Sequence, residues 1–226
     1  MEILFDGNII KPAKTAAESL GILFSKECIP YAQIERVRSN VRTMRTLIRK
    51  NYRIRTPEIM LRLYKTYILP RISYCSQQWH TGLEKHLKRI EGEITSFWKL
   101  CDTKMAPEDF LGLREQLILN DLVLMHRIWK GVSTISFDEF FSICDHQKNT
   151  NAEIEVKKYK KVFAKNTFAH RMHKYWNYLS LETRNQSAGL FKKEIKALLK
   201  NKKRRQHLLN FGLRSPISGA PSGIYE

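Results

Sequence analysis

The feature that most constrains the fold is a helical repeat of apolar residues that begins at Ile34. Ile34, Val37, Val41, Met44 and Ile48 recur every three or four positions, which is typical of a helix that buries one face. More repeats of this kind follow along the chain, whereas the opening 28 residues hold the strand-like patterns. We therefore predict a mainly α protein with a small amino-terminal β-hairpin, a helical bundle and a basic helical carboxy-terminal region.

Two short segments carry the strand pattern. In "EILFDGNII", strand-forming residues flank Asp6-Gly7, a pair that favours a hairpin turn. In "SLGILFS", Gly21 lies inside an apolar run. Glycine weakens a strand interior, so Gly21 indicates a bend or a close backbone approach, or marks the end of an ordinary strand.

Four arginines accompany the first helical stripe. Each follows an apolar position by one residue, about 100° around the helix; they are Arg38, Arg42, Arg45 and Arg49. A row of guanidiniums can follow a phosphate backbone. The alternative is an exposed helix with salt bridges, but the only carboxylate three or four residues away along the helix is Glu35, opposite Arg38.

Two further patterns concern helix packing. "LYKTYILPRISYCSQQW" has helical spacing with Pro70 in its middle, where proline costs about 3 kcal/mol. We expect a neighbouring feature to accommodate this proline. Farther on, a narrow apolar seam predicts a partner helix; its members are Leu83, Leu87, Ile90, Ile94, Phe97 and Cys101.

The charge is unevenly distributed. The chain carries 40 basic and 22 acidic residues, a net charge of +18. Residues 36–71 have a net charge of +10 and residues 156–206 of +14, whereas residues 72–155 have −4. Separated basic blocks favour two contact surfaces for nucleic acid over charge that is simply solvated. Besides the four arginines, the candidate contacts are Lys50, Arg53, Arg55, Lys157, Lys158, Lys160, Lys161, Arg171, Lys174, Lys202, Lys203, Arg204 and Arg205.

Patterns for catalysis or metal binding are weak. The four cysteines form no C-x-x-C pair, and Cys144 with His146 lacks a second ligand pair. His170 and His173 are three residues apart on a basic segment, without a third ligand. Phosphate-loop, G-x-S-x-G and H-E-x-x-H motifs are missing from the sequence. We predict no metal and no cofactor.

The sequence also bears on location. No apolar run is long enough to span a bilayer, so we expect a soluble intracellular protein. The run "KNKKRR" (Lys200 to Arg205) resembles a nuclear import signal, but it also suits a phosphate patch or a solvated helix end. The nucleus is thus the expected compartment, and an organelle is the alternative.

Several segments in order resemble a known family. "SLGILFS", a basic helix, "LYKTYILPRISYCSQQW", "LKRIEGEITSFWKL" and "FAHRMHKYWNYLSLETRNQSAGLFKKEIKALL" together resemble the carboxy-terminal half of non-LTR retrotransposon reverse transcriptases. The resemblance implies a hairpin like the primer grip at Leu20, Gly21 and Ile22, and a thumb helix from Ile34. It implies that Pro70 kinks or divides a helix.

The same resemblance divides the chain. Residues 1–30 would be the end of the palm, 31–143 a thumb-like bundle, 152–206 the basic carboxy-terminal region and 207–226 a flexible tail. Reverse transcriptases hold two magnesium ions with an aspartate pair, and this sequence has no Asp-Asp pair. We therefore expect the chain to begin downstream of the catalytic motifs and to have no activity by itself, whether or not it is a fragment of an RNA-directed DNA polymerase.

The sequence thus predicts a reverse-transcriptase-derived module that grips RNA or an RNA/DNA duplex through its backbone. Its expected partners are that nucleic acid and either the upstream catalytic part of a reverse transcriptase or other ribonucleoprotein subunits. Two alternatives remain open. One is a recruited RNA-binding structural subunit of a larger ribonucleoprotein such as a ribosome. The other is a helical protein–protein adaptor, which an exposed Leu83–Cys101 seam would favour.

Overall fold

The computed structural model describes residues 3–5, 8–10, 16–25, 30–81, 84–104, 106–107, 110–144, 153–156 and 167–213. These residues are mostly helical, which confirms the predicted fold class. They form two compact units, residues 1–120 with 161–168 and residues 121–160 with 169–226. The division falls inside one continuous helix, whereas the sequence suggested a boundary at the loop after residue 143.

Two hairpins lie at the amino-terminal end. Strand β1 (Ile3–Phe5) pairs antiparallel with β2 (Asn8–Ile10), as predicted. Strand β3 (Ala16–Ser19) pairs with β4 (Ile22–Ser25), and the φ angles of Leu20 and Gly21 between them are 48° and 78°. Two successive positive φ angles are what a two-residue type I′ turn requires. Gly21 therefore lies in the turn rather than inside a strand.

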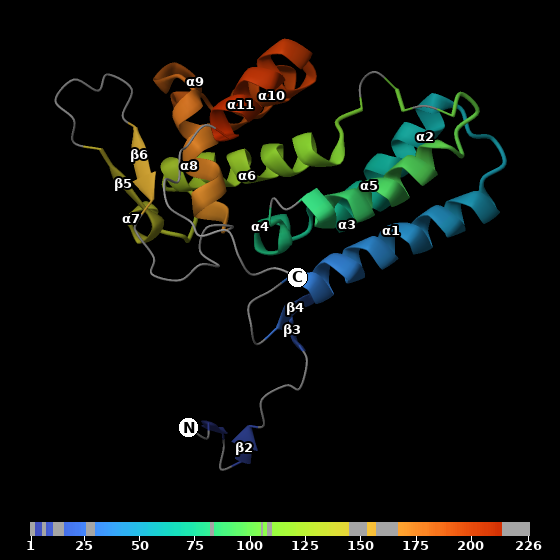
Figure 1. Ribbon diagram of the computed structural model, residues 1–226, viewed down its shortest axis with the longest axis horizontal. Coiled ribbons are helices and arrows are strands. Elements are labelled where there is room, and N and C mark those ends of the chain that lie inside the picture. The colour runs from blue at the N-terminus through green and yellow to red at the C-terminus, as the bar shows by residue number, and fades with distance from the viewer. Residues whose placement is uncertain are drawn as a thin grey trace, which may run out of the picture. The chain divides into compact units, whose positions relative to one another are not determined.

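The core of the first unit lies between two long helices. Helix α1 (Tyr31–Asn51) runs along α5 (Glu84–Trp98) (Figure 1). The predicted stripe of α1 is buried except for Met44, which is half-buried at its edge. The seam of α5 is buried from Leu87 to Cys101, and Leu83 lies outside the described residues. The observation that would favour an adaptor, an exposed seam, is therefore not found.

A turn of π-helix accommodates Pro70. Helix α2 (Pro57–Leu63) leads into the π-helix η1 (Tyr64–Ile68), and α3 (Leu69–Ser73) follows. Leu69 donates its N–H to the carbonyl oxygen of Tyr64, five residues back. Because the wider turn ends just before Pro70, the proline ring enters at the second position of α3 instead of inside a regular α-helix. Residues 57–73 are therefore helical throughout, and the irregularity lies in the turn that precedes Pro70.

The π-turn also changes which side chains are buried. Regular helical spacing from Leu63 predicts a buried Tyr67, but Tyr67 is 40% exposed, while Tyr64 is buried. The extra residue in the turn rotates the following positions around the helix axis. The resemblance also implies that Tyr74 and Trp79 pack below the kink; Tyr74 is 50% exposed, while Trp79 at the end of α4 (Ser76–Trp79) is buried.

Helix α6 (Leu113–Trp129) is continuous where local sequence signals favour two helices, one from Pro107 to Leu117 and one capped by Asn120. Asn120 does not cap a helix because tertiary contacts occupy its side chain. Its amide donates to Ser76 Oγ (3.3 Å), and its Oδ1 accepts from Gln116 (2.9 Å). The Asn120 carbonyl also accepts from Gln77 (3.2 Å), so this residue joins α6 to α4.

The second unit is built around Trp176 and Phe191. Its elements after α6 are α7 (Phe137–Phe140), β5 (Phe141–Ile143), β6 (Ile154–Val156), α8 (Phe168–Tyr178), α9 (Leu181–Asn185), α10 (Ala188–Lys200) and α11 (Lys202–Leu213). Trp176 of α8 contacts Phe191 of α10 and Trp129 of α6, with ring centroids 5.9 and 5.8 Å apart. Each of the four tryptophans falls in or beside an apolar stripe, which predicts a core anchor; Trp129 is half-buried and the other three are buried.

Three features of this unit differ from the sequence prediction. The β5–β6 hairpin was not predicted. Residues 207–213 were assigned to a tail but belong to α11, and residues 214–226 lie outside the described residues. The spacing of Phe191, Ile195, Leu198 and Leu199 predicts one last helix, but the structure has two, α10 and α11, with Asn201 between them. Over the described ranges, no helix combines the length and apolar character needed to cross a membrane.

Candidate nucleic-acid interface

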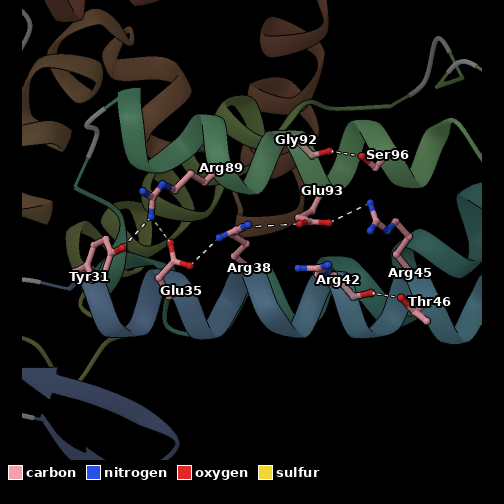
Figure 2. A network of polar contacts seen from close by, with 10 residues as sticks. All are labelled: Tyr31, Glu35, Arg38, Arg42, Arg45, Thr46, Arg89, Gly92, Glu93 and Ser96. Atoms are coloured by element: carbon pink, nitrogen blue, oxygen red, sulfur yellow. Dashed lines mark hydrogen bonds and ion pairs between the residues drawn. The ribbon is translucent and has the colours of Figure 1, made fainter.

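The arginine row of α1 separates into two pairs. Arg38 and Arg45 turn toward α5, where they flank Glu93 (Figure 2). The nitrogen–oxygen distances are 3.8 Å for Arg38 and 3.1 Å for Arg45, and the Glu93 side chain is only 12% exposed. These two arginines therefore do not form part of an open phosphate track. The expectation that the row lacks countercharge is wrong for them, because their partner comes from another helix.

Further polar contacts between α1 and α5 lie near the start of α1. Arg89 of α5 donates to Glu35 Oε1 (2.6 Å) and to the hydroxyl of Tyr31 (2.9 Å), while Glu35 Oε2 accepts from Arg38 (2.9 Å). The hydrogen bond from Arg89 lowers the pKa of Glu35 below its ordinary value, and Arg38 acts in the same direction against partial burial. This network (Figure 2) fixes how α1 lies on α5.

The other two arginines face solvent. Arg42 and Arg49 are exposed, as are Lys50 and Arg53 just beyond them. None of these four has an ion pair within the described part of the chain. Figure 2 draws Arg42 on α1 between the two anchored arginines, and its backbone carbonyl accepts from the Thr46 hydroxyl (3.0 Å).

Arg55 has a local structural role. Its Nε donates to the carbonyl oxygen of Tyr52 (3.0 Å), and its NH2 donates to that of Arg49 (2.8 Å). These carbonyls belong to the last turn of α1, where backbone acceptors lack helical partners. Arg55 therefore caps α1, and its side chain contributes less to an open cationic surface than the sequence suggested.

The predicted primer-grip-like hairpin is anchored by its turn. The Tyr74 hydroxyl donates to the Leu20 carbonyl oxygen (2.6 Å), and a Cβ placed on Gly21 would lie 3.8 Å from Tyr74 Cε1. That spacing is ordinary contact, so the positive φ is what requires glycine, rather than lack of space. Ile22 is buried and Leu20 is 89% exposed. Ile22 thus belongs to the core, Gly21 allows the turn, and Leu20 forms its exposed tip.

The carboxy-terminal candidates divide in a similar way. Arg171 bonds to the fully buried carboxylate of Asp121 (3.2 Å), and its side chain is only 10% exposed, so it is a structural ion pair rather than an open phosphate contact. Lys174 is half-buried, Lys202, Lys203 and Arg204 are exposed, and Arg205 is half-buried. The lysines at 157, 158, 160 and 161 lie outside the described residues.

Helix α10 adds cations that the sequence analysis missed. Lys192, Lys193, Lys196 and Lys200 are all exposed on this helix. Three of them recur every four residues, which places them along one face. Glu194, the carboxylate of this helix, accepts from Thr183 (2.9 Å) and Gln186. The spacing 192, 196, 200 is the sequence signal for this row of cations, and it lies just before the denser "KKRR" run.

The two histidines of α8 do not form part of a larger ligand set. The ring centroids of His170 and His173 lie 6.5 Å apart. Across the residues that the structure describes, no three His, Cys, Asp or Glu side chains cluster in a way that could hold a metal ion. Burial lowers the pKa of both histidines, which favours their neutral form.

Comparison with known proteins gave no relative: no family model, no curated protein and no solved structure matches the chain.

Proposed function

We propose that the chain is a nucleic-acid-binding module of reverse-transcriptase origin that grips the phosphate backbone of RNA or an RNA/DNA duplex and carries no polymerase chemistry of its own. The observation that supports this most is the exposed group of Arg42, Arg49, Lys50 and Arg53. These side chains have no ion pair among the described residues, while their neighbours Arg38 and Arg45 are occupied. Exposed cations without carboxylate partners suit a polyanion.

The two kinds of arginine have complementary roles in this proposal. Arg38 and Arg45 hold α1 on α5 through Glu93, and Arg42 and Arg49 are presented by a helix that is fixed in place. Seven residues separate the presented pair, which is about 10 Å along the helix axis. Phosphates of one strand rise about 3.4 Å each in B-form DNA and somewhat less in the A-like duplexes that RNA forms, so the pair spans roughly three to four of them. Such contacts position a duplex without reading its sequence.

The ordered likeness to non-LTR reverse transcriptases supports the same assignment. In the proposal, the β3–β4 turn with Leu20 at its tip approaches a nucleic-acid end, and the exposed cations of α10 and α11 give a second contact surface. A recruited ribonucleoprotein subunit would use the same backbone contacts. A helical adaptor is less supported because the α5 seam is covered by α1.

The test is the salt dependence of binding to RNA and to a hybrid duplex. Arg42→Gln/Arg49→Gln removes two phosphate contacts, so the slope of log affinity against log salt should fall by about 1.4 to 1.8, equally for unrelated sequences. Lys88→Gln/Lys99→Gln is the matched control, since it removes two exposed cations at α5 and just after it. Equal slopes for wild type and the arginine variant would reject the proposal for this surface.

A further inference from the structure

A small hollow lies where the β3–β4 turn, α1 and α3 meet. It measures about 280 Å³ and belongs entirely to the first unit. Two cations line it, Arg36 from α1 and Arg71 from α3, together with the amide side chains of Gln33 and Asn40. Its remaining walls are Gly21, Val37, Pro70 and Tyr74. The hollow therefore combines two positive charges and neutral donors with an apolar wall.

The hairpin is held at this place by three separate contacts. The Tyr74 hydroxyl donates to the Leu20 carbonyl oxygen (2.6 Å), and the Leu23 N–H donates to Gln33 Oε1 (3.0 Å). Arg36 forms an ion pair with Glu18 of β3 (2.9 Å). These contacts, at the turn and on both strands, hold the hairpin side of the hollow in place against α1 and α3.

Several donors of the hollow are still available. Each guanidinium has five N–H groups; Arg36 uses one NH1 contact with Glu18, and Arg71 uses one with the carbonyl oxygen of Tyr67 (2.5 Å). Gln33 is 4% exposed, and the Leu23 N–H fixes its amide orientation because it must meet the oxygen. The Gln33 NH₂ group has no acceptor within the described residues.

We propose that this hollow binds the phosphate group of a phosphate ester, with Arg36 and Arg71 as charged donors and the amides of Asn40 and Gln33 as neutral ones. Two guanidiniums from different helices match the several acceptor oxygens of a phosphate. The apolar wall of Val37, Pro70 and the Tyr74 ring leaves room for the sugar next to the phosphate. The phosphate chemistry stands independently, and only a nucleic-acid source for it rests on the proposed function.

Arginine side-chain NMR on the intact protein tests the site directly. Inorganic phosphate should shift the Nε–H signals of Arg36 and Arg71 with a Kd on the order of 1 mM, as expected for two charge-assisted contacts. Absence of a shift at about 20 mM phosphate, well above that Kd, would overturn the proposal. Arg62 of α2 is exposed and does not line the hollow, so its signal is the internal control.

Two substitutions move the affinity in opposite directions. Asn40→Glu places a carboxylate four residues after Arg36, where it competes for the guanidinium, and should weaken phosphate binding about tenfold. Glu18→Gln releases Arg36 and should tighten binding about two- to fivefold, the range of an exposed pair. Both Asn40 and Glu18 are exposed, so the fold should survive either change.

Thr43→Glu is the matched control for Asn40→Glu. It adds the same charge at another exposed position of α1 that does not line the hollow. Equal weakening by Asn40→Glu and Thr43→Glu would show that only net charge matters, and would overturn the site. Unchanged affinity in Glu18→Gln would contradict the role of Arg36.

A last comparison identifies the source of the phosphate. A 5′-mononucleotide and a single-stranded oligonucleotide without terminal phosphates are titrated separately. Tighter binding of the mononucleotide assigns a terminal phosphate, and tighter binding of the oligonucleotide assigns a backbone phosphate. If Arg42→Gln/Arg49→Gln leaves duplex binding unchanged while Arg36 and Arg71 still respond to phosphate, the proposed function fails and the phosphate site stands.

Discussion

Glu93 of α5 pairs with Arg38 and Arg45 of α1, and this three-residue contact, called the Glu93 clamp below, gives the sharpest stability prediction. Arg38→Gln/Arg45→Gln removes both cations beside a carboxylate that is 12% exposed. Removing the partner of a fully buried charge costs about 3 to 5 kcal/mol. The two arginine side chains are 35% and 24% exposed, so solvent screens part of this interaction. We therefore expect the free energy of unfolding of the first unit to fall by about 1 to 3 kcal/mol.

The two single variants, Arg38→Gln and Arg45→Gln, should lower the free energy of unfolding by different amounts. Arg45 lies closer to Glu93, at 3.1 Å against 3.8 Å, and it is the less exposed of the two. Arg38 also keeps Glu35 as a second partner, and Glu35 in turn keeps Arg89. Arg45→Gln should therefore destabilise more than Arg38→Gln.

Urea denaturation followed by circular dichroism measures these effects. With a slope of about 2 kcal/mol per molar urea, the double variant should unfold at a midpoint lower by about 0.5 to 1.5 M. Adding Glu93→Gln removes the unpaired carboxylate and should restore at least half of the loss. Arg42→Gln/Arg49→Gln is the matched control and should keep the wild-type midpoint. Equal destabilisation by both double variants, or no recovery with Glu93→Gln, would refute the clamp.

Two further predictions concern the hairpin turn and pH. Leu20→Asn should stabilise the β3–β4 hairpin by about 0.5 to 1 kcal/mol because asparagine tolerates the positive φ at this position better than leucine. Slower amide exchange at Ile22, which pairs with Ser19 across the turn, would show it, and faster exchange would contradict it. Burial lowers the pKa of His126 from 6.5, so the unfolded chain binds its proton more readily and stability falls as pH drops below that value. Midpoints measured at about pH 7.5 and 5.5 should differ less in His126→Gln than in the wild type, and parallel losses would contradict this.

The sequence predicted features that depend on local periodicity. The stripe of α1 and the seam of α5 were found because apolar spacing records which face of a helix is buried. The β1–β2 hairpin followed from strand-forming residues around Asp6-Gly7, whereas the β3–β4 hairpin was implied only by the resemblance. Of the interpretations offered for Gly21, the bend is the one that its place in the turn matches. Each of these patterns lies within a short continuous segment of the sequence.

Features that depend on contacts between distant residues were not predictable in this way. Glu93 lies 55 positions after Arg38, so a search for carboxylates along one helix could not find this partner. Arg171 looked like an exposed cation until the buried Asp121 was placed beside it. Asn120 has a cap-forming side chain, but contacts from α4 and within α6 keep it inside a continuous helix.

The π-turn before Pro70 connects a local defect in the helix to the candidate phosphate site. Tyr64 lies one turn after the buried Met60 and packs against Phe97 and Trp98, with centroids 5.9 and 5.6 Å away. A regular α-helix would place Tyr67 one turn after the buried Leu63, whereas the wider turn brings Tyr67 to an exposed position. The rotation affects every later residue of the segment, including Arg71 and Tyr74, which line the hollow together with Pro70. Tyr74 then holds the hairpin turn through Leu20. The proline is therefore tolerated where a helix irregularity already positions the side chains that anchor the hairpin, and π-turns are often found at functional sites.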